Sequence, residues 1–233
     1  MTAGNWERAV REQVGLGRLL PLGDAADGTW IAERAAAGVL RRAAAGVREA
    51  RVTGLRVGLA DPGDQVDSEP RGGRADARAL GGAEAVGPAP VSALPYGELR
   101  ISAQCDATVD RPMTATAAAL REALLRGAEE RLGLRVAAVD VHVAGLLETP
   151  QTAAQPVPGG PPDSPPPTAR ETDRPGHGAP DVPGVVDSDV LPDGDHAEVR
   201  VVLDSAHRAL DVARAVRTRT DAATVTVLVT EIR

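Results

Sequence analysis

Two carboxylates and a histidine are the residues whose types and spacing come nearest to a reaction centre. Asp106 and Asp140 fall on the polar sides of two strand-like segments, and His142 follows on the same side as Asp140. Neighbouring strands could place the two carboxylates face to face, as general acid–base chemistry requires. The pattern gives them no cleft and no further partner, so we expect a solvent-exposed pair and predict no catalytic residues.

Cys105 is the single cysteine, which excludes an intrachain disulfide and fits a reducing compartment. It lies on the apolar side of its strand-like segment, so a buried, inert thiol is expected. The four histidines are far apart in sequence, and His207 stands early in a predicted helix as a solvated side chain.

Two short motifs resemble ligand loops without meeting their requirements. GLGRLLPLG, residues 15–23, lacks the third glycine of a dinucleotide fingerprint and any GKS or GKT, so we expect a packed connector. DGDH, residues 193–196, lacks the spacing and the trailing Glu of a calcium loop. Because GxSxG, HExxH and CxxC are also missing, the sequence predicts no cofactor, no metal site and no enzyme.

A β-α-β unit between Glu98 and Leu147 organises the chain. Residues 98–109 alternate apolar and polar side chains as a half-buried strand does. Residues 112–132 place leucines and an alanine at helical spacing, and Gly133 supplies the left-handed stop. Residues 136–146 alternate again. We expect the two strands to be parallel, with a right-handed crossover.

The segments before this unit predict two helices and one strand. Residues 6–14 read as a short amphipathic helix, and Thr29 as the N-cap of a second helix over residues 30–45. Residues 55–59 alternate as a strand. The expected fold class is therefore α+β: a small mixed sheet with helices on one face, in the order helix-strand-strand-helix-strand.

Composition divides the chain into three parts. Residues 1–147 form the expected domain, with a flexible insertion at 61–95. Residues 148–196, rich in Pro and Asp, are expected to be a disordered linker. Residues 197–233 repeat the β-α-β unit in abbreviated form. Because so small a unit buries too little alone, we expect it to dock on the first domain and extend one sheet to about five strands.

The net charge of −7 is concentrated outside the predicted folded parts. Residues 61–97 and 149–196 together hold 14 acidic residues against five arginines, and the remainder carries a net +2. This balance provides no dominant basic face, so no nucleic-acid partner is expected. No run of residues approaches the ~20 apolar residues of a membrane span.

The order of elements over residues 29–147 resembles the alkaline shock protein family, also called the envelope stress response family. TWIAERAAAGVLRRAAAGV, PYGELRI and RLGLRVAAVDVHVAGL stand where that family has its helix, its approach to the second strand and its closing run. The long insertion and the C-terminal unit depart from the usual members.

The resemblance implies a non-enzymatic cytoplasmic protein at the inner face of the membrane. Such a protein would act in envelope stress by self-assembly, or by docking to a membrane-anchored or homologous protein partner, with membrane contact that is only indirect. A KH-like nucleic-acid-binding module is the alternative, since similar element orders occur there. That fold needs a GxxG loop between two helices, which is missing at that position.

Overall fold

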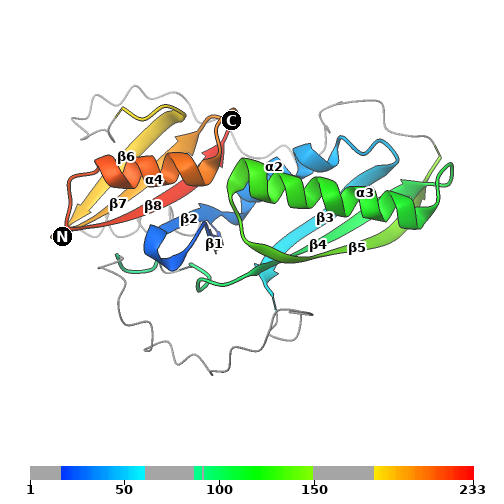
Figure 1. The fold of residues 1–233 in the computed structure, drawn as a ribbon, viewed down its shortest axis with the longest axis horizontal. Helices are drawn as coiled ribbons and strands as arrows, with labels where there is room; N and C mark the ends of the chain where they lie inside the picture. The colour runs from blue at the N-terminus through cyan, green and yellow to red at the C-terminus, as the bar shows by residue number, and fades with distance from the viewer. Residues whose placement is uncertain (1–16, 61–86, 91, 149–180) are drawn as a thin grey trace, which may run out of the picture.

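The computed structural model describes residues 17–60, 87–90, 92–148 and 181–233, which form two mixed sheets with helices, as the predicted α+β class requires (Figure 1). Sheet A contains, in spatial order, β1 (Leu19–Pro21), β2 (Thr29–Ala32), β8 (Thr224–Ile232), β7 (His196–Leu203) and β6 (Val185–Asp193). Sheet B contains β3 (Ala50–Leu59), β4 (Leu99–Thr108) and β5 (Val136–Leu147). The helical segments are η1 (Ala25–Asp27), α2 (Glu33–Ala44), α3 (Met113–Arg126), the π-helical η3 (Gly127–Leu132) and α4 (Ala209–Arg219).

Sheet B follows from the alternating pattern of its strands. β3 and β4 are antiparallel, whereas β4 and β5 are parallel and joined through α3, as predicted. The apolar positions of β4, such as Leu99 and Ile101, are fully buried under the helices. Gly133 ends η3 with a φ of 83°, the left-handed conformation that suits glycine.

The β-α-β repeat is present and includes one more strand than predicted. β6 is antiparallel to β7, and β7 is parallel to β8 through α4, so β6-β7-α4-β8 repeats the topology of β3-β4-α3-β5. The linker expected over 148–196 is wrong at its C-terminal end, where the structure places β6 at Val185–Asp193, and residues 149–180 lie outside the described residues. An edge strand tolerates its aspartates and Pro192, because one side of the strand makes no ladder bonds.

The N-terminal part of the chain completes sheet A. β2 pairs in parallel with β8, with Trp30 opposite Leu228, and β1 adds an antiparallel outer strand. The predicted helix over residues 30–45 is correct only from Glu33, because Thr29–Ala32 form a strand. Trp30 is 1% exposed there, so tertiary burial overrides the helical spacing of these residues.

The tail at 197–233 does not extend the sheet that contains residues 98–147. Its strand β8 pairs with β2, which gives a sheet of five strands beside a separate sheet of three, contrary to the single extended sheet expected (Figure 1). α2 contacts β3, α3 and β8, and the buried side chains of both sheets form one core. β2 is held beside the edge of β8 because the chain passes from β2 directly into α2, and α2 packs against both sheets.

A segment before β4 covers the outer face of sheet A. The ring of Tyr96 lies 4.9 Å from that of Trp30, and Thr226 donates from its hydroxyl to the carbonyl of Pro88 at 3.4 Å. Most of the predicted insertion, residues 61–86 and 91, lies outside the described residues, as does the predicted helix at 6–14. The remaining insertion residues pack on sheet A, because the apolar outer face of β2 and β8 needs cover.

Candidate interaction surface

One face of sheet B carries polar side chains and faces away from the helices. The register of the three strands places twelve residues on it, which we call the open face: Arg51, Gly54, Arg56, Gly58, Arg100, Ser102, Gln104, Asp106, Ala138, Asp140, His142 and Gly145. Six of them are partly buried. The other six are exposed: Arg51, Arg56, Ser102, Gln104, Asp140 and His142. Five of its twelve positions are glycine, alanine or serine, so much of this face carries little or no side chain.

The structure separates the two carboxylates considered for catalysis. Asp140 lies opposite Ser102, and Asp106 lies opposite Gly145, which puts the carboxylates about four residues apart along the strands. That offset is roughly 13 Å at a rise of about 3.3 Å per residue. Asp140 accepts a hydrogen bond from Arg100 at 2.8 Å. The face-to-face pair that the sequence left possible is therefore not formed, because the strand register staggers the two carboxylates.

Asp106 and His142 lie on the same face of sheet B, and each has different neighbours. The Asp106 carboxylate lies 3.9 Å from the Arg51 guanidinium. His142 stands opposite Gln104 and is exposed. The geometry therefore pairs opposite charges on this face and does not bring Asp106, Asp140 and His142 together at one point.

Cys105 is fully buried on the inner face of β4. Burial raises the pKa of its thiol, and the neighbouring Asp106 charge adds to the effect. His207 is exposed and lies 3.9 Å from Asp204. Within the described residues, no group of three or more His, Cys, Asp or Glu side chains could hold a metal ion.

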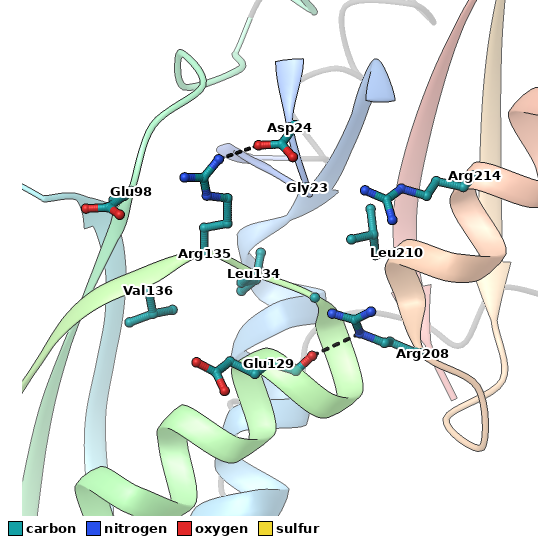
Figure 2. A pocket seen from close by; sticks show the side chains of 11 residues that line it. Gly23, Asp24, Glu98, Glu129, Leu134, Arg135, Val136, Arg208, Leu210 and Arg214 are labelled. Carbon is teal, nitrogen blue, oxygen red and sulfur yellow. Dashed lines mark hydrogen bonds and ion pairs between the residues drawn. The ribbon is translucent and has the colours of Figure 1, made fainter. Parts of the chain in front are cut away.

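A polar hollow of about 380 Å³ lies where the two sheets meet, between η3, the start of β5 and α4 (Figure 2). Arg135, Arg208 and Arg214 point toward it. Arg135 is paired with Asp24, and Arg208 donates to the carbonyl oxygen of Glu129 at 3.0 Å. The guanidinium groups thus bond to other parts of the chain. We call the residues around this hollow the joint between the sheets.

A bidentate ion pair of this joint links α4 to η1. Arg214 donates two hydrogen bonds to Asp27, at 2.8 and 2.9 Å, in a bidentate geometry. Burial is the largest influence on Asp27 and opposes its ionisation, yet the Arg214 hydrogen bonds, the Asp24 backbone N–H and the charges of Arg214 and Arg217 together hold the pKa of this carboxyl below its usual value. Arg217 also donates to the carbonyl of Ala26. The joint therefore anchors the turn that precedes β2.

The outer edge of β5 exposes backbone hydrogen-bonding groups. Leu99 donates its N–H to the carbonyl of Arg135 at 2.8 Å, which sets the odd residues of β4 to bond β5. In this parallel register, Val139, Val141 and Val143 then direct their N–H and C=O groups away from β4. Arg121 confirms the direction, because its Nε donates to the Val139 carbonyl at 3.2 Å. Among the described strands, none pairs with this edge.

The outer edge of β1 is covered by another part of the chain, and the outer edge of β3 carries a side-chain cap at Val57. Leu19 of β1 donates its N–H to Ser92 at 3.1 Å and accepts from Leu94 at 2.8 Å. On β3, the outward N–H of Val57 donates to the Glu33 carboxylate at 3.1 Å. Both contacts satisfy groups that a further strand would need.

The sequence of β6 disfavours the addition of a further strand at its outer edge. Three aspartates and Pro192 lie within its nine residues, and its register shifts between Val185 and Asp187. Charge, proline and irregularity are the usual protections of an exposed edge. β5 differs, because its 12 residues include one charged side chain, Asp140, and no proline.

Exposed apolar side chains gather at one end of sheet B. Leu146 near the end of β5 is 63% exposed, Val109 after β4 is 68% exposed, and Met113 at the start of α3 is 43% exposed. The parallel strands β4 and β5 bring these positions to the same end of the sheet (Figure 1). Apolar side chains beside a free edge favour protein association.

Sequence patterns gave part of this surface and missed its main feature. The alternating valines of residues 139–143 predicted a strand, but a free edge depends on the order of strands in the sheet.

No helix in the described ranges is long and apolar enough to cross a membrane. Searches against protein-family models, curated proteins and solved structures find no match to this chain.

Proposed function

We propose that this chain is a non-enzymatic assembly protein that binds other protein chains through the free edge of β5. Its role would be the one implied by the resemblance to alkaline shock proteins: envelope stress response at the inner face of the membrane, by self-assembly or by docking to a membrane-anchored partner. The observation that carries the proposal is the outward row of N–H and C=O groups at Val139, Val141 and Val143.

Strand addition to a sheet edge explains why these groups matter. An added strand supplies main-chain hydrogen bonds along the edge, and its side chains meet those of β5 on both faces. The valines of β5 are only partly buried in the present sheet, so a further strand would cover them. The exposed Leu146 at the end of the same strand adds apolar area.

The KH-like nucleic-acid alternative has weaker support. Single-stranded nucleic acids bind to aromatic side chains that stack on bases, and the open face carries none. Trp30 and Tyr96 pack against each other with tilted rings on sheet A. On the open face, Arg51 and Arg100 lie beside Asp106 and Asp140, which offset their charge.

The test is affinity capture with the full-length chain from membrane and soluble fractions, comparing wild type with Val141→Pro and Val141→Ala. Proline removes the outward N–H of residue 141 but breaks no bond to β4, whereas alanine keeps that N–H and loses the same side-chain packing. We expect wild type and V141A to recover the same proteins and V141P to lose them, with circular dichroism unchanged. V143P repeats the test if V141P does not fold.

Equal recovery of partners by wild type and both proline variants would refute the role of the edge. Recovery of short RNA or DNA with sub-micromolar affinity at ~0.15 M salt would instead support the KH-like alternative.

A further inference from the structure

We infer that the strand added to β5 is the β5 strand of a second copy of this chain, antiparallel and centred on Val141, so that two copies of sheet B form one continuous sheet of six strands. This inference rests on the proposed function and names the partner of the same edge. It follows from three features of β5: its direction of hydrogen bonding, its regular central stretch and its charge order.

The hydrogen-bonding direction fits a two-fold axis at Val141. Because this residue points its N–H and C=O outward, two copies related by the axis would exchange a pair of bonds between their Val141 residues. The outward groups of Val139 would likewise meet those of Val143 in the second copy. Arg121 holds the Val139 carbonyl in the single chain, and it would yield that oxygen to an N–H of the incoming strand.

The regular part of β5 is long enough for this pairing. Register shifts against β4 fall at Ala137 and Ala144, which leaves residues 138–143 without irregularity. Five cross-strand pairs from Val139 to Val143 lie inside that stretch. Beyond it, the shifts would end the ladder, which limits the pairing to this register and its immediate neighbours.

The charge order of β5 selects the register. Centring on Val141 puts Asp140 of each copy opposite His142 of the other, twice in the interface, on the open face. The carboxylate accepts and the imidazole N–H donates, in either charge state of the histidine. On the inner face the same register pairs valine with valine, a favourable cross-strand combination.

The neighbouring registers are less favourable. A side chain must meet one on the same face, so the axis has to pass through a residue position. Centring on Asp140 places two carboxylates opposite each other, which is destabilising. Centring on His142 pairs two imidazoles and leaves Asp140 opposite Ala144, where β5 is irregular.

A disulfide test reads the register directly. In a Cys105→Ala background, Val141→Cys places the two thiols opposite each other, and the Cα separation of about 5.5 Å in a hydrogen-bonded pair suits a disulfide. Val139→Cys is the matched control, because its two copies would lie roughly 13 Å apart, four residues along the strand. We expect mild oxidation to link V141C into dimers and to leave V139C monomeric on non-reducing gels.

A charge exchange provides the second test, by sedimentation of the full chain. His142→Asp puts like charges opposite each other twice, and we expect the dimer dissociation constant to rise about tenfold or more. The exchange variant D140H/H142D restores the complementary pairs, and its dimer should return toward wild-type affinity. A V141P chain should be monomeric.

Three results would overturn the inference: a wild-type chain that stays monomeric at high concentration, equal cross-linking of V139C and V141C, or an H142D dimer as tight as wild type. The proposed function fails separately. A monomeric wild type that still loses its captured partners through V141P would refute self-pairing and leave partner binding at the edge intact.

Discussion

The two β-β-α-β units of this chain share one topology and differ in what surrounds their last strand. In sheet A, β8 has β2 along its outer edge, and its outer face lies under the segment that contains Tyr96. In sheet B, the corresponding strand β5 has an outer edge that no described strand covers, and side chains on the open face remain exposed. The last strand of the unit is thus covered by neighbouring parts of the chain in sheet A, whereas in sheet B its outer edge has no partner among the described strands.

Burial along the two strands records this difference. Five consecutive residues of β8, Val225–Val229, are buried, whereas β5 alternates between partly buried and exposed positions until Leu147. A strand with two neighbours and two covered faces contributes its side chains to stability. A strand with one neighbour keeps an exposed edge. Substitutions in each sheet can test this comparison.

The largest effect is expected from removing the buried aromatic side chain of sheet A that packs against its cover. Trp30→Ala leaves a cavity beside Tyr96 and Leu228 and should lower the free energy of unfolding by about 3–5 kcal/mol. Gln104→Ala, on the open face of sheet B, is the control and should change it by about 0.5 kcal/mol or less. Urea unfolding measures both, and similar losses would contradict the contrast between the faces.

The next effect concerns the joint between the sheets. An alanine at position 133 would place its Cβ 2.6 Å from the Cβ of Leu210, on a backbone with positive φ. We expect Gly133→Ala to cost about 2–4 kcal/mol, since overpacking adds to the left-handed penalty. Gly194→Ala shares the positive φ and meets no atom within 4 Å, so about 1–2 kcal/mol is expected. Thermal unfolding ranks the pair, and the reverse order would count against a tight joint.

A smaller difference should separate the opening of the two sheets. Cys105 is buried in sheet B and Trp30 in sheet A. In a Trp6→Phe background, the Cys105 thiol should become accessible to an alkylating reagent at lower urea than the change in Trp30 fluorescence, because sheet B has an exposed open face whereas β8 of sheet A is buried on both faces over Val225–Val229. Coincident transitions would show that the shared core unfolds as one unit.

The smallest effect belongs to the Arg214–Asp27 pair. The pKa of Asp27 is lower in the folded chain than in the unfolded one, so the pair contributes above the ordinary value of 3.8 and loses that contribution as the pH falls through the depressed folded pKa. Arg214→Gln should remove less than about 1 kcal/mol at pH 7 and flatten the fall in stability below pH about 4, since Arg214 is partly exposed. Arg126→Gln, from an exposed i,i+4 pair, is the control. An unchanged acid profile for R214Q would argue against the linkage.

Local patterns in the sequence predicted the elements of both units and not the way they combine. Alternation at residues 98–109 identified β4, and the glycine at 133 identified the end of the helical segment formed by α3 and η3, because those signals depend on near neighbours. Thr29–Ala32 looked helical because its pairing partner, Val227–Val229, lies almost 200 residues away. β6 was missed because an edge strand tolerates Pro192 and aspartates. The free edge of β5 likewise depends on strand order, which no local pattern encodes.

The long separation between β2 and β8 has a consequence for synthesis. Residues 50–147 can complete sheet B as soon as they leave the ribosome, because its three strands lie within that range. β2 must wait for Thr224–Ile232, and sheet A closes only when that segment has been made. Stalled chains ending near residue 147 should therefore protect β4 from protease and leave the peptide around Trp30 open to cleavage. During translation, the surface that we propose for assembly would be ready before the half of the protein that supports it.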